Sequence, residues 1–416
     1  MNLTTTFADS LRAYFPDDLP RTIAVAVSGG GDSIALLHLT REWGEAHGVS
    51  VSAVTVDHGL RPEAADEAKH VAAICAQLAI PHAILKWTGW DQSGNTQDQA
   101  RRARIDLIGR WAREQGIDFV ATGHTLDDQA ETVLMRLGRG SGVDGLSGIP
   151  RKRTIEGVQW IRPLLDTGRE ELRAFLREQG IDWIEDPSND DDTFGRVRAR
   201  QAMSHLATLG ITAQGLAETA KRMASARDVL EQAVELAARR VAKVANGDVS
   251  LKIDGLMALM PEIRRRLLSH VLNWVARGDY PPRAAAVYDL EVAISQGKSA
   301  TLHGCFVSVG KDRIVVTREW NAVKEKVSDV KALWDDRWSI SGPGDDGYVV
   351  AALGEAGLSE CPNWRESGRI RAAVMASPAI WKGDELIAAP LAEKANGWTA
   401  KPLYDSIHFF SSILSH

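Results

Sequence analysis

A glycine-rich stretch near the N-terminus carries the strongest chemical signal in the chain. The apolar run 23–27 is followed by six small or acidic residues, which are Ser28, Gly29, Gly30, Gly31, Asp32 and Ser33. A strand that passes through a glycine turn into a helix leaves backbone N–H groups free to bind phosphate. A carboxylate within the turn repels phosphate unless a cation lies between them, so Asp32 predicts Mg²⁺. The structural alternative is a glycine turn in which Asp32 and Ser33 only cap the helix.

This pattern differs from two common nucleotide-binding loops. The kinase-type loop needs a lysine before its final hydroxyl residue, and Asp32 stands there. The dinucleotide fingerprint needs a third glycine at the position of Ile34. The remaining pattern, S-G-G-x-D-S, closely resembles the pyrophosphate-binding loop of ATP pyrophosphatases, which split ATP into AMP and pyrophosphate while adenylating an oxygen of their substrate. The resemblance implies that ATP binds here.

A second motif, at 123–132, is rich in acids and follows another predicted strand. It contains His124, Asp127, Asp128 and Glu131. In a helix that starts near Asp127, residues three and four positions apart share a face, so these acids lie together. Acids at a helix N-terminus are also favourable without any ligand. Because both motifs follow strands of one predicted sheet, we favour a site for Mg²⁺ or for a cationic substrate.

Short basic clusters interrupt a chain whose net charge is −6. The arginines that we expect to contact phosphates are Arg101, Arg104, Arg139, Arg196 and Arg200. Solvated helix faces would account for some of them, and a polyanionic partner would account for several at once. Glycines recur through 138–148, where we predict a binding loop rather than a linker or regular structure.

Strand and helix patterns alternate through the first half of the chain. Strands are predicted at 22–28, 51–57, 82–87 and 118–122, and helices at 33–47, 64–78 and 96–115. This order predicts an α/β fold with a doubly wound parallel sheet, whose ligand lies at the carboxyl ends of the strands. We expect a catalytic domain at 1–211, a mainly helical middle domain at 212–320 and a small α+β domain at 331–416. A hairpin at 299–317 and a charged linker at 321–329 are also predicted.

Composition narrows the class of protein. Of the 416 residues, 44% are hydrophobic and 25% are charged, as in soluble globular proteins. No signal peptide or membrane-spanning stretch is evident, so we expect a cytoplasmic protein that does not bind membranes. The three cysteines, at 75, 305 and 361, are too far apart for a C-x-x-C pair and are expected to be buried. The tryptophans of the last segment are expected in its core more than on an RNA-binding surface.

Taken together, the motifs resemble those of the tRNA(Ile)-lysidine synthase family, in the family's order. They are S-G-G-G-D-S at 28–33, D-H-G-L-R at 57–61, A-R-R-A-R at 100–104, G-H-T-L-D-D-Q-A-E-T at 123–132, R-G-S-G-V-D-G-L-S-G-I at 139–149, R-P-L-L at 162–165 and D-P-S-N at 186–189. The set covers about half of the chain, and the last segment resembles the family's tRNA-binding domain. Val197 departs from the Arg-Asn pair that the family often has there.

The resemblance implies an ATP-dependent ligase that modifies the wobble cytidine of an isoleucine tRNA with a CAU anticodon. The cytidine O2 would attack the ATP α-phosphorus, and free L-lysine would then attack carbon 2 and expel AMP. Asp32 and Asp127 would hold Mg²⁺, and His58 would contact ATP. Asp128 and Glu131 would bind lysine, and one of them or His124 would accept its proton. A homodimer is compatible with the sequence.

Three alternatives to an ATP-dependent ligase are considered. A tRNA thiolase of the same superfamily needs a reactive cysteine or an iron–sulfur cluster, and no motif contains a cysteine. A non-catalytic RNA-binding relative would be expected to lack the acidic motifs. A nicotinamide dehydrogenase with Asp57 as its ribose ligand is disfavoured by the missing third glycine.

Overall fold

The computed structural model describes residues 2–60, 63–88, 96–185, 195–278, 280–344 and 347–414. These residues form two compact units, one over residues 1–227 and the other over residues 228–415. Each unit is considered by itself below. The division differs from the three domains expected from the sequence, because the predicted middle and C-terminal domains belong to one compact unit.

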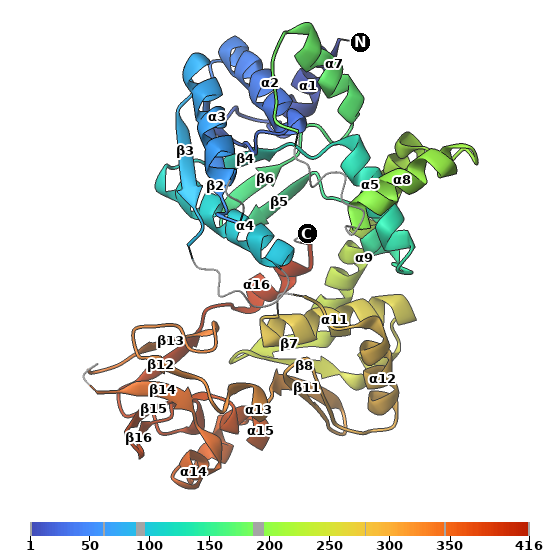
Figure 1. Cartoon of the computed structure of the whole chain (residues 1–416). Helices are drawn as coiled ribbons and strands as arrows, with labels where there is room; N and C mark the ends of the chain where they lie inside the picture. Colours follow the sequence, from blue (N-terminus) through green and yellow to red (C-terminus); the bar gives the residue numbers. More distant parts are fainter. Residues whose placement is uncertain are drawn as a thin grey trace. The chain divides into compact units, whose positions relative to one another are not determined.

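A six-stranded sheet forms the centre of the first unit (Figure 1). Its order is β3-β2-β1-β4-β6-β5, and all neighbouring strands are parallel except β5 and β6. The strands are β1 Thr22–Ala26, β2 Ser50–Asp57, β3 His82–Lys86, β4 Phe119–Thr122, β5 Lys152–Ile155 and β6 Val158–Ile161. The four predicted strands are therefore confirmed. The β5–β6 hairpin was not predicted from the sequence. Its turn residues, Glu156 and Gly157, have the positive φ angles, 47° and 85°, that tight hairpin turns require.

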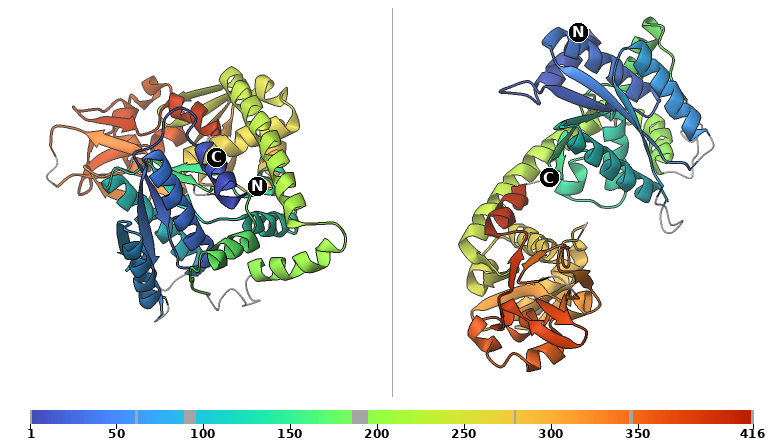
Figure 2. Two further views of the ribbon diagram at one scale, coloured as in Figure 1. Left: turned by 90° about the horizontal axis from the view of Figure 1, so that it is seen from above. Right: turned by 90° about the vertical axis from the view of Figure 1, so that its left-hand side faces the viewer.

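Helices cover both faces of this sheet (Figure 2). They are α1 Leu3–Arg12, α2 Gly31–His47, α3 Ala64–Gln77, α4 Thr96–Glu114, α5 Leu126–Leu137, α6 Val143–Leu146, α7 Arg169–Glu178 and α8 Gly195–Ala207. One apolar core joins the sheet to α1, α2, α3 and α7, and a second core joins it to α4 through Ile108 and Ala112. The doubly wound α/β prediction is confirmed.

The strand order brings the two acidic motifs together. The central strand β1 pairs with β2 on one side and with β4 on the other, so the chain order reverses between β1 and β4. In open α/β sheets, ligands bind in the crevice at the carboxyl ends of the strands beside such a reversal. The glycine-rich loop follows β1 and the 123–132 motif follows β4, which places both motifs at this point.

A long helix and an antiparallel sheet begin the second half of the chain. Helix α9 spans Ala213–Val241, and the helices that follow are α10 Ile253–Met257, α11 Pro261–Ala276 and α12 Ala284–Ser295. The sheet has the order β7-β8-β11-β10-β9. Its strands are β7 Ala242–Ala245, β8 Asp248–Lys252, β9 Ala300–Leu302, β10 Cys305–Val309 and β11 Arg313–Arg318.

Sequence patterns predicted this region only in part. The expected hairpin is confirmed, since β10 pairs with β11 around residues 310–312. The expectation of mainly helical structure at 212–320 was wrong at 242–252, where β7 and β8 form a hairpin. Its turn residues Asn246 and Gly247 have φ angles of 51° and 70°. An Asn-Gly pair between two stretches of alternating hydrophobic residues is the sequence signal for such a turn.

The last segment folds around tryptophans within the second unit. It contains α13 Trp320–Val323, β12 Val327–Asp329, β13 Trp338–Ser341, β14 Val349–Ala352, α14 Gly354–Ser359, α15 Arg371–Met375, β15 Pro378–Lys382, β16 Glu385–Ala388, β17 Thr399–Pro402 and α16 Ser406–Ser411. Trp334, Trp338 and Trp398 are buried in its core, as expected. The charged linker predicted at 321–329 was wrong, because this stretch enters α13 and β12.

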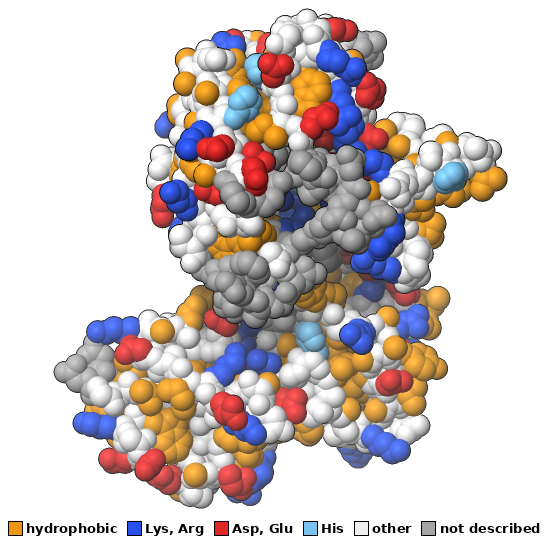
Figure 3. All heavy atoms as spheres, viewed as in Figure 1, with side chains coloured by type: hydrophobic (Ala, Val, Ile, Leu, Met, Phe, Trp, Pro, Cys, Tyr) orange, Lys and Arg blue, Asp and Glu red, His pale blue; other side chains and the backbone are white. Residues whose placement is uncertain are grey.

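Charged side chains of both signs are visible on the surface (Figure 3). In the view of Figure 3, lysines and arginines are interspersed with acids and do not form one continuous basic face. Within the described ranges, no helix has the length and apolarity needed to cross a membrane.

Candidate nucleotide and amine site

The glycine-rich loop is shaped by its own two serines. Ser33 Oγ donates to the Gly30 carbonyl at 2.8 Å and accepts from the Ser28 N–H at 3.2 Å. Gly29 has a φ of 91°, a conformation that other residues rarely adopt. Helix α2 then begins with Gly30 as its N-cap, so Gly30, Gly31 and Asp32 contribute N–H groups at a helix start. The Ser33 N–H is bonded to the Gly30 carbonyl and is not part of this set.

Close packing fixes the loop from two sides. A Cβ on Gly29 would lie 2.8 Å from Ile184 Cδ1, and the Ile184 N–H donates to the Gly29 carbonyl at 3.0 Å. Across the sheet edge, a Cβ on Gly123 would lie 3.1 Å from the Asp32 backbone. Only glycine therefore lets the start of the second motif approach the phosphate loop this closely. Sequence reasoning did not identify the chain near Ile184 as part of the site.

Helix α5 carries the acids of the second motif in the expected arrangement. Thr125 is its N-cap, and its hydroxyl accepts from the Asp128 N–H at 3.4 Å. The Asp128 carboxylate accepts in return from the Thr125 N–H at 2.9 Å, which completes a capping box. One oxygen of Asp128, Oδ2, therefore serves to cap the helix. Its other oxygen, Oδ1, faces cationic side chains.

Arg169 joins the two motifs, and sequence reasoning missed it. Its Nε lies 3.2 Å from Asp32 Oδ2, its Nη2 3.3 Å from Asp128 Oδ1 and its Nη1 3.4 Å from Glu131 Oε1. The Arg169 N–H also donates to Asp127 Oδ2 at 2.7 Å, so Asp127 caps the start of α7. Burial raises the pKa of Asp32, and the Arg169 charge opposes this shift. The position of Arg169 shortly after the R-P-L-L motif was the available signal.

Glu131 is the most buried acid of the cluster. It is 2% exposed, and its Oε1 accepts from Arg200 Nε at 3.0 Å. Its other oxygen, Oε2, has no hydrogen-bond partner among the residues that the structure describes. A buried carboxylate oxygen without a donor costs free energy, so this oxygen is available to a ligand that donates.

The two arginines of α8 lie beside the acids. Arg196 Nη1 is 3.9 Å from Asp128 Oδ1, and Arg200 contacts Glu131. Their four-residue spacing places them on one helical face, as expected. They were predicted to contact phosphates of a polyanionic partner, and in the structure their charges neutralise the acidic cluster.

His124 lies in a cationic part of the site. Its Nδ1 is 2.9 Å from the Thr122 hydroxyl. Burial, together with the nearby charges of Arg162, Arg104 and Arg196, lowers the pKa of His124 to about 3. The imidazole is therefore neutral near pH 7. Arg162 itself is 7% exposed, and its Nε has no partner within the described part of the chain.

Arg104 and His58 are also affected by burial. Burial and the charges of Arg101 and Arg196 lower the pKa of Arg104, so the basic residues of α4 and α8 lie within electrostatic range of one another. His58 follows β2, and its ring meets that of Trp87 edge to face at 5.8 Å. Burial and the charge of Arg104 lower the pKa of His58.

The glycine-rich loop after α5 is attached to that helix. Gln129 Nε2 donates to the Ile149 carbonyl at 3.1 Å, and Arg136 Nη1 donates to the carbonyls of Gly145 and Gly148 at 2.9 Å each. Arg139 is exposed at its beginning. The expectation of no regular structure was wrong for 143–146, which form the single turn α6.

Two parts of the expected site are outside the described residues. These are Arg61, at the end of the D-H-G-L-R motif, and the D-P-S-N segment at 186–189.

The donor set fits Mg²⁺ only as part of a nucleotide complex. No group of three or more His, Cys, Asp or Glu side chains within the described ranges is arranged to hold a metal by itself. Mg²⁺ in ATP sites typically takes one or two carboxylates together with phosphate oxygens. Asp32 offers one such carboxylate at the phosphate loop. Asp127 already accepts the α7 N–H through Oδ2, and Asp128 is close enough to raise the pKa of Asp32.

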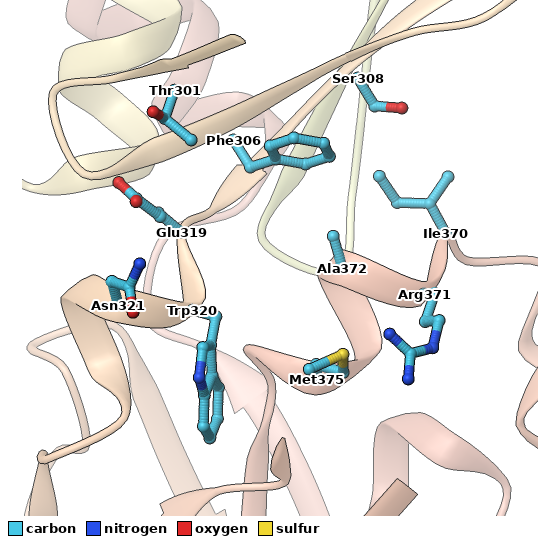
Figure 4. A pocket seen from close by; sticks show the side chains of 10 residues that line it. All are labelled: Thr301, Phe306, Ser308, Glu319, Trp320, Asn321, Ile370, Arg371, Ala372 and Met375. Carbon is cyan, nitrogen blue, oxygen red and sulfur yellow. The ribbon is translucent and has the colours of Figure 1, made fainter. Parts of the chain in front are cut away.

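The second unit contains a pocket of about 470 Å³. Residues from β9, β10, α13 and α15 line it, and Figure 4 shows Phe306, Trp320 and Met375 among them. None of its lining residues belongs to the sequence motifs described above.

Comparisons with known proteins agree on one family. A family model described as a PP-loop domain matches residues 3–206. A tRNA(Ile)-lysidine synthase of Ruegeria pomeroyi is 49% identical over 406 residues, which cover 98% of this chain and 97% of that protein. One from Wolbachia pipientis wMel is 33% identical over 379 residues, which cover 88% of each chain.

Among solved structures, the U34-tRNA thiolase NcsA from Methanococcus maripaludis matches 53% of this chain and 78% of its own, with a TM-score of 0.46 and 19% identity. The two lysidine synthases identify the family more directly than this structure does, because their sequence identity extends through both units of the chain. With S-G-G-G-D-S after β1 and the acids of α5 beside it, this chain belongs to the tRNA(Ile)-lysidine synthase family.

Proposed function

We propose that this protein is an ATP-dependent ligase that joins free L-lysine to carbon 2 of the wobble cytidine in an isoleucine tRNA with a CAU anticodon. The products are lysidine, AMP and pyrophosphate. The single observation that supports a cationic amine substrate is Glu131, a buried acid with one unpartnered oxygen beside the phosphate loop. Family membership supports the tRNA substrate.

In the first step, the cytidine O2 attacks the ATP α-phosphorus and pyrophosphate leaves. The N–H groups of Gly30, Gly31 and Asp32 would hold the phosphates at the start of α2. Bound Mg²⁺ would neutralise charge on the phosphates, and Asp32 with Asp127 or Asp128 would hold it. His58 is proposed to contact ATP. The arginines at 101, 104, 139, 196 and 200 would bind phosphates of ATP or of the anticodon loop.

In the second step, the neutral lysine ε-amine attacks carbon 2, the bond to the AMP oxygen breaks and the amine loses a proton. Asp128 and Glu131 would orient the amine, and we propose Glu131 as the proton acceptor, since its Oε2 is unpartnered. His124 is the weaker candidate. Its pKa of about 3 makes it a poor base near pH 7, where a general base works best with a pKa near the operating pH.

A reactive cysteine for thiolase chemistry has no support. All three cysteines are free and buried. Burial raises the pKa of Cys75 to about 11 and that of Cys305 to about 12, and it also raises the pKa of Cys361. A thiol held protonated in this way is a poor nucleophile.

The decisive experiment combines purified protein, ATP, Mg²⁺, lysine and the CAU-anticodon isoleucine tRNA. Nucleoside mass spectrometry is expected to detect a lysine adduct of cytidine, with AMP and pyrophosphate in equal amounts. Reactions without lysine and with Asp32→Asn are the controls. Formation of ADP, or sulfur addition that does not depend on lysine, would contradict the proposal. We further propose that the protein is cytoplasmic. We also propose that it forms a homodimer, which sedimentation can test.

A further inference from the structure

Arg169 lies where a substrate cation would be expected. Its guanidinium is 3.2 to 3.4 Å from three carboxylates, which belong to Asp32, Asp128 and Glu131. Well-paired charged groups form N–H···O bonds of about 2.7–2.9 Å. Arg169 therefore spans all three acids without a close bidentate pair to any one of them.

The helix that carries Arg169 does not explain this position. Arg169 is the first residue of α7, whose N-cap, Gly168, provides no side-chain hydrogen bond. A positive charge at a helix N-terminus is unfavourable, because the helix dipole already makes that end positive. The acidic cluster, not the stability of α7, accounts for an arginine here.

Glu131 offers a position for a second cation. Arg169 and Arg200 both contact its Oε1, while its buried Oε2 has no partner among the described residues. A ligand ammonium group can donate to Oε2, but its positive charge would be repelled while the Arg169 guanidinium stays between the acids. The guanidinium and the amine therefore compete for the same negative charge.

We infer that Arg169 is a positioning residue that couples nucleotide binding to lysine binding. Without ligands, its guanidinium neutralises the acids of both motifs. Nucleotide phosphates at the loop beside Asp32 attract the guanidinium away from Asp128 and Glu131, which then bind the lysine ammonium. The inference rests on the proposed function, since lysine is taken as the amine. By thermodynamic linkage, lysine strengthens nucleotide binding by the same factor.

The test is a calorimetric titration of lysine with and without Mg²⁺ and α,β-methylene ATP, which cannot release pyrophosphate. In the wild type, the nucleotide is expected to lower the lysine Kd about five-fold or more, a typical size for coupled sites. In Arg169→Gln, the lysine Kd without nucleotide is expected to be lower than that of the wild type, and the nucleotide is expected to leave it unchanged.

Arg177→Gln is the matched control. It removes one positive charge from the same helix, where Arg177 pairs with exposed Glu170, and it should behave as the wild type. Circular dichroism and the thermal unfolding midpoint report whether each variant is folded. If Arg169→Gln does not fold, Arg169→Lys serves instead, and its nucleotide effect is expected to be smaller because an ammonium cannot span three carboxylates.

Three outcomes would overturn the inference. A nucleotide effect in Arg169→Gln or Arg169→Lys equal to that of the wild type would remove the coupling role. Loss of lysine binding in Arg169→Gln, with nucleotide binding intact, would mean that Arg169 builds the lysine site rather than competing for it. A wild type that binds nucleotide but no lysine would instead reject the proposed function, and this inference with it.

Discussion

At the scale of single residues, the site is a set of acids whose charges are shared by arginines from other elements. Asp32 comes from α2, and Asp128 and Glu131 come from α5. Arg169 and Arg200 come from α7 and α8 and contact these acids directly. Each acid can therefore be tested separately for its role in one of the two chemical steps.

Asp32→Asn is expected to abolish pyrophosphate release with and without lysine, because Asp32 acts at the phosphates in the first step. The ATP–pyrophosphate exchange assay measures this directly. The fold should survive, and Asp66→Asn, which removes an exposed acid from α3, is the control. Near-normal exchange in Asp32→Asn would mean that Asp32 only caps α2, a role that contributes about 1 kcal/mol.

Glu131→Gln is expected to raise the lysine KM far more than the ATP KM. The amide keeps the shape of the side chain but removes the negative charge that would attract the ammonium group. Steady-state kinetics with each substrate varied in turn separate the two effects. An equal rise in both KM values would assign Glu131 to the nucleotide or its metal ion instead.

His124 predicts how stability depends on pH. Its folded-state pKa of about 3 lies below the ordinary value of 6.5, so the folded state resists protonation. The contribution of His124 to the free energy of unfolding is complete above pH 6.5. It is lost as the pH falls from 6.5 toward 3, by up to about 1.4 kcal/mol per pH unit. Urea unfolding at pH 7 and pH 5 should therefore show a smaller difference in His124→Asn than in the wild type. An equal pH dependence in both proteins would contradict this.

At the scale of elements, the sheet reversal between β1 and β4 creates the site, and short-range contacts fix the loops around it. The loop after α5 is held by the Gln129 amide, which bonds to both the N–H and the carbonyl of Ile149 at 2.5 and 3.1 Å. Gly148 has a φ of 68°, and a Cβ there would lie 2.3 Å from Gln129 Oε1. Glycine is therefore required where the loop returns to the helix.

Gln129→Ala is expected to release this loop while α5 stays folded. Limited trypsin digestion should then cut faster after exposed Arg139, because the loop loses the two hydrogen bonds that attach Ile149 to α5. Gln99→Ala, a change of the same type on α4, is the control. A cleavage rate equal to that of the wild type would mean that Arg136 alone holds the loop through its bonds to Gly145 and Gly148.

At the scale of the whole molecule, the second unit contains an ionic cluster around the buried side chain of Asp335. Asp335 accepts from Arg318 Nε at 2.9 Å and from Lys326 Nζ at 2.6 Å. The Arg318 contact joins the antiparallel sheet to the tryptophan-rich segment. Phe409 and Ile413, near the end of the chain, also belong to the core around α11. Truncation near residue 321 removes these core residues and the partner of Arg318, so it is expected to destabilise residues 228–320. Any tRNA binding by 331–416 should therefore be tested with surface charge variants.

Asp335→Ala is expected to destabilise the second unit by about 3–5 kcal/mol, because it leaves the buried Arg318 charge without its partner. Urea unfolding followed by tryptophan fluorescence measures the loss. ATP–pyrophosphate exchange should persist below the unfolding range, since the motifs lie in the first unit. Glu325→Ala, at an exposed acid nearby, should leave the unfolding midpoint unchanged. A midpoint for Asp335→Ala equal to that of the wild type would show that the pair adds no net stability.

The sequence by itself determined the alternating α/β order, the phosphate loop and the acids of α5. These features depend on local patterns, which are buried strand runs, helical periodicity and glycines at fixed offsets. The shared helical faces of Asp128 with Glu131 and of Arg196 with Arg200 also follow from spacing alone.

Only the tertiary structure decided which charges meet. Arg169 is 137 residues from Asp32 in the chain, and no local pattern relates them. Arg200 pairs with Glu131 across 69 residues, although its sequence context favoured a phosphate. Such contacts depend on where β4 lies beside β1 and on how α7 and α8 return to the sheet edge. Burial is likewise a property of the folded chain, and it gives His124 its low pKa and leaves Glu131 Oε2 without a partner.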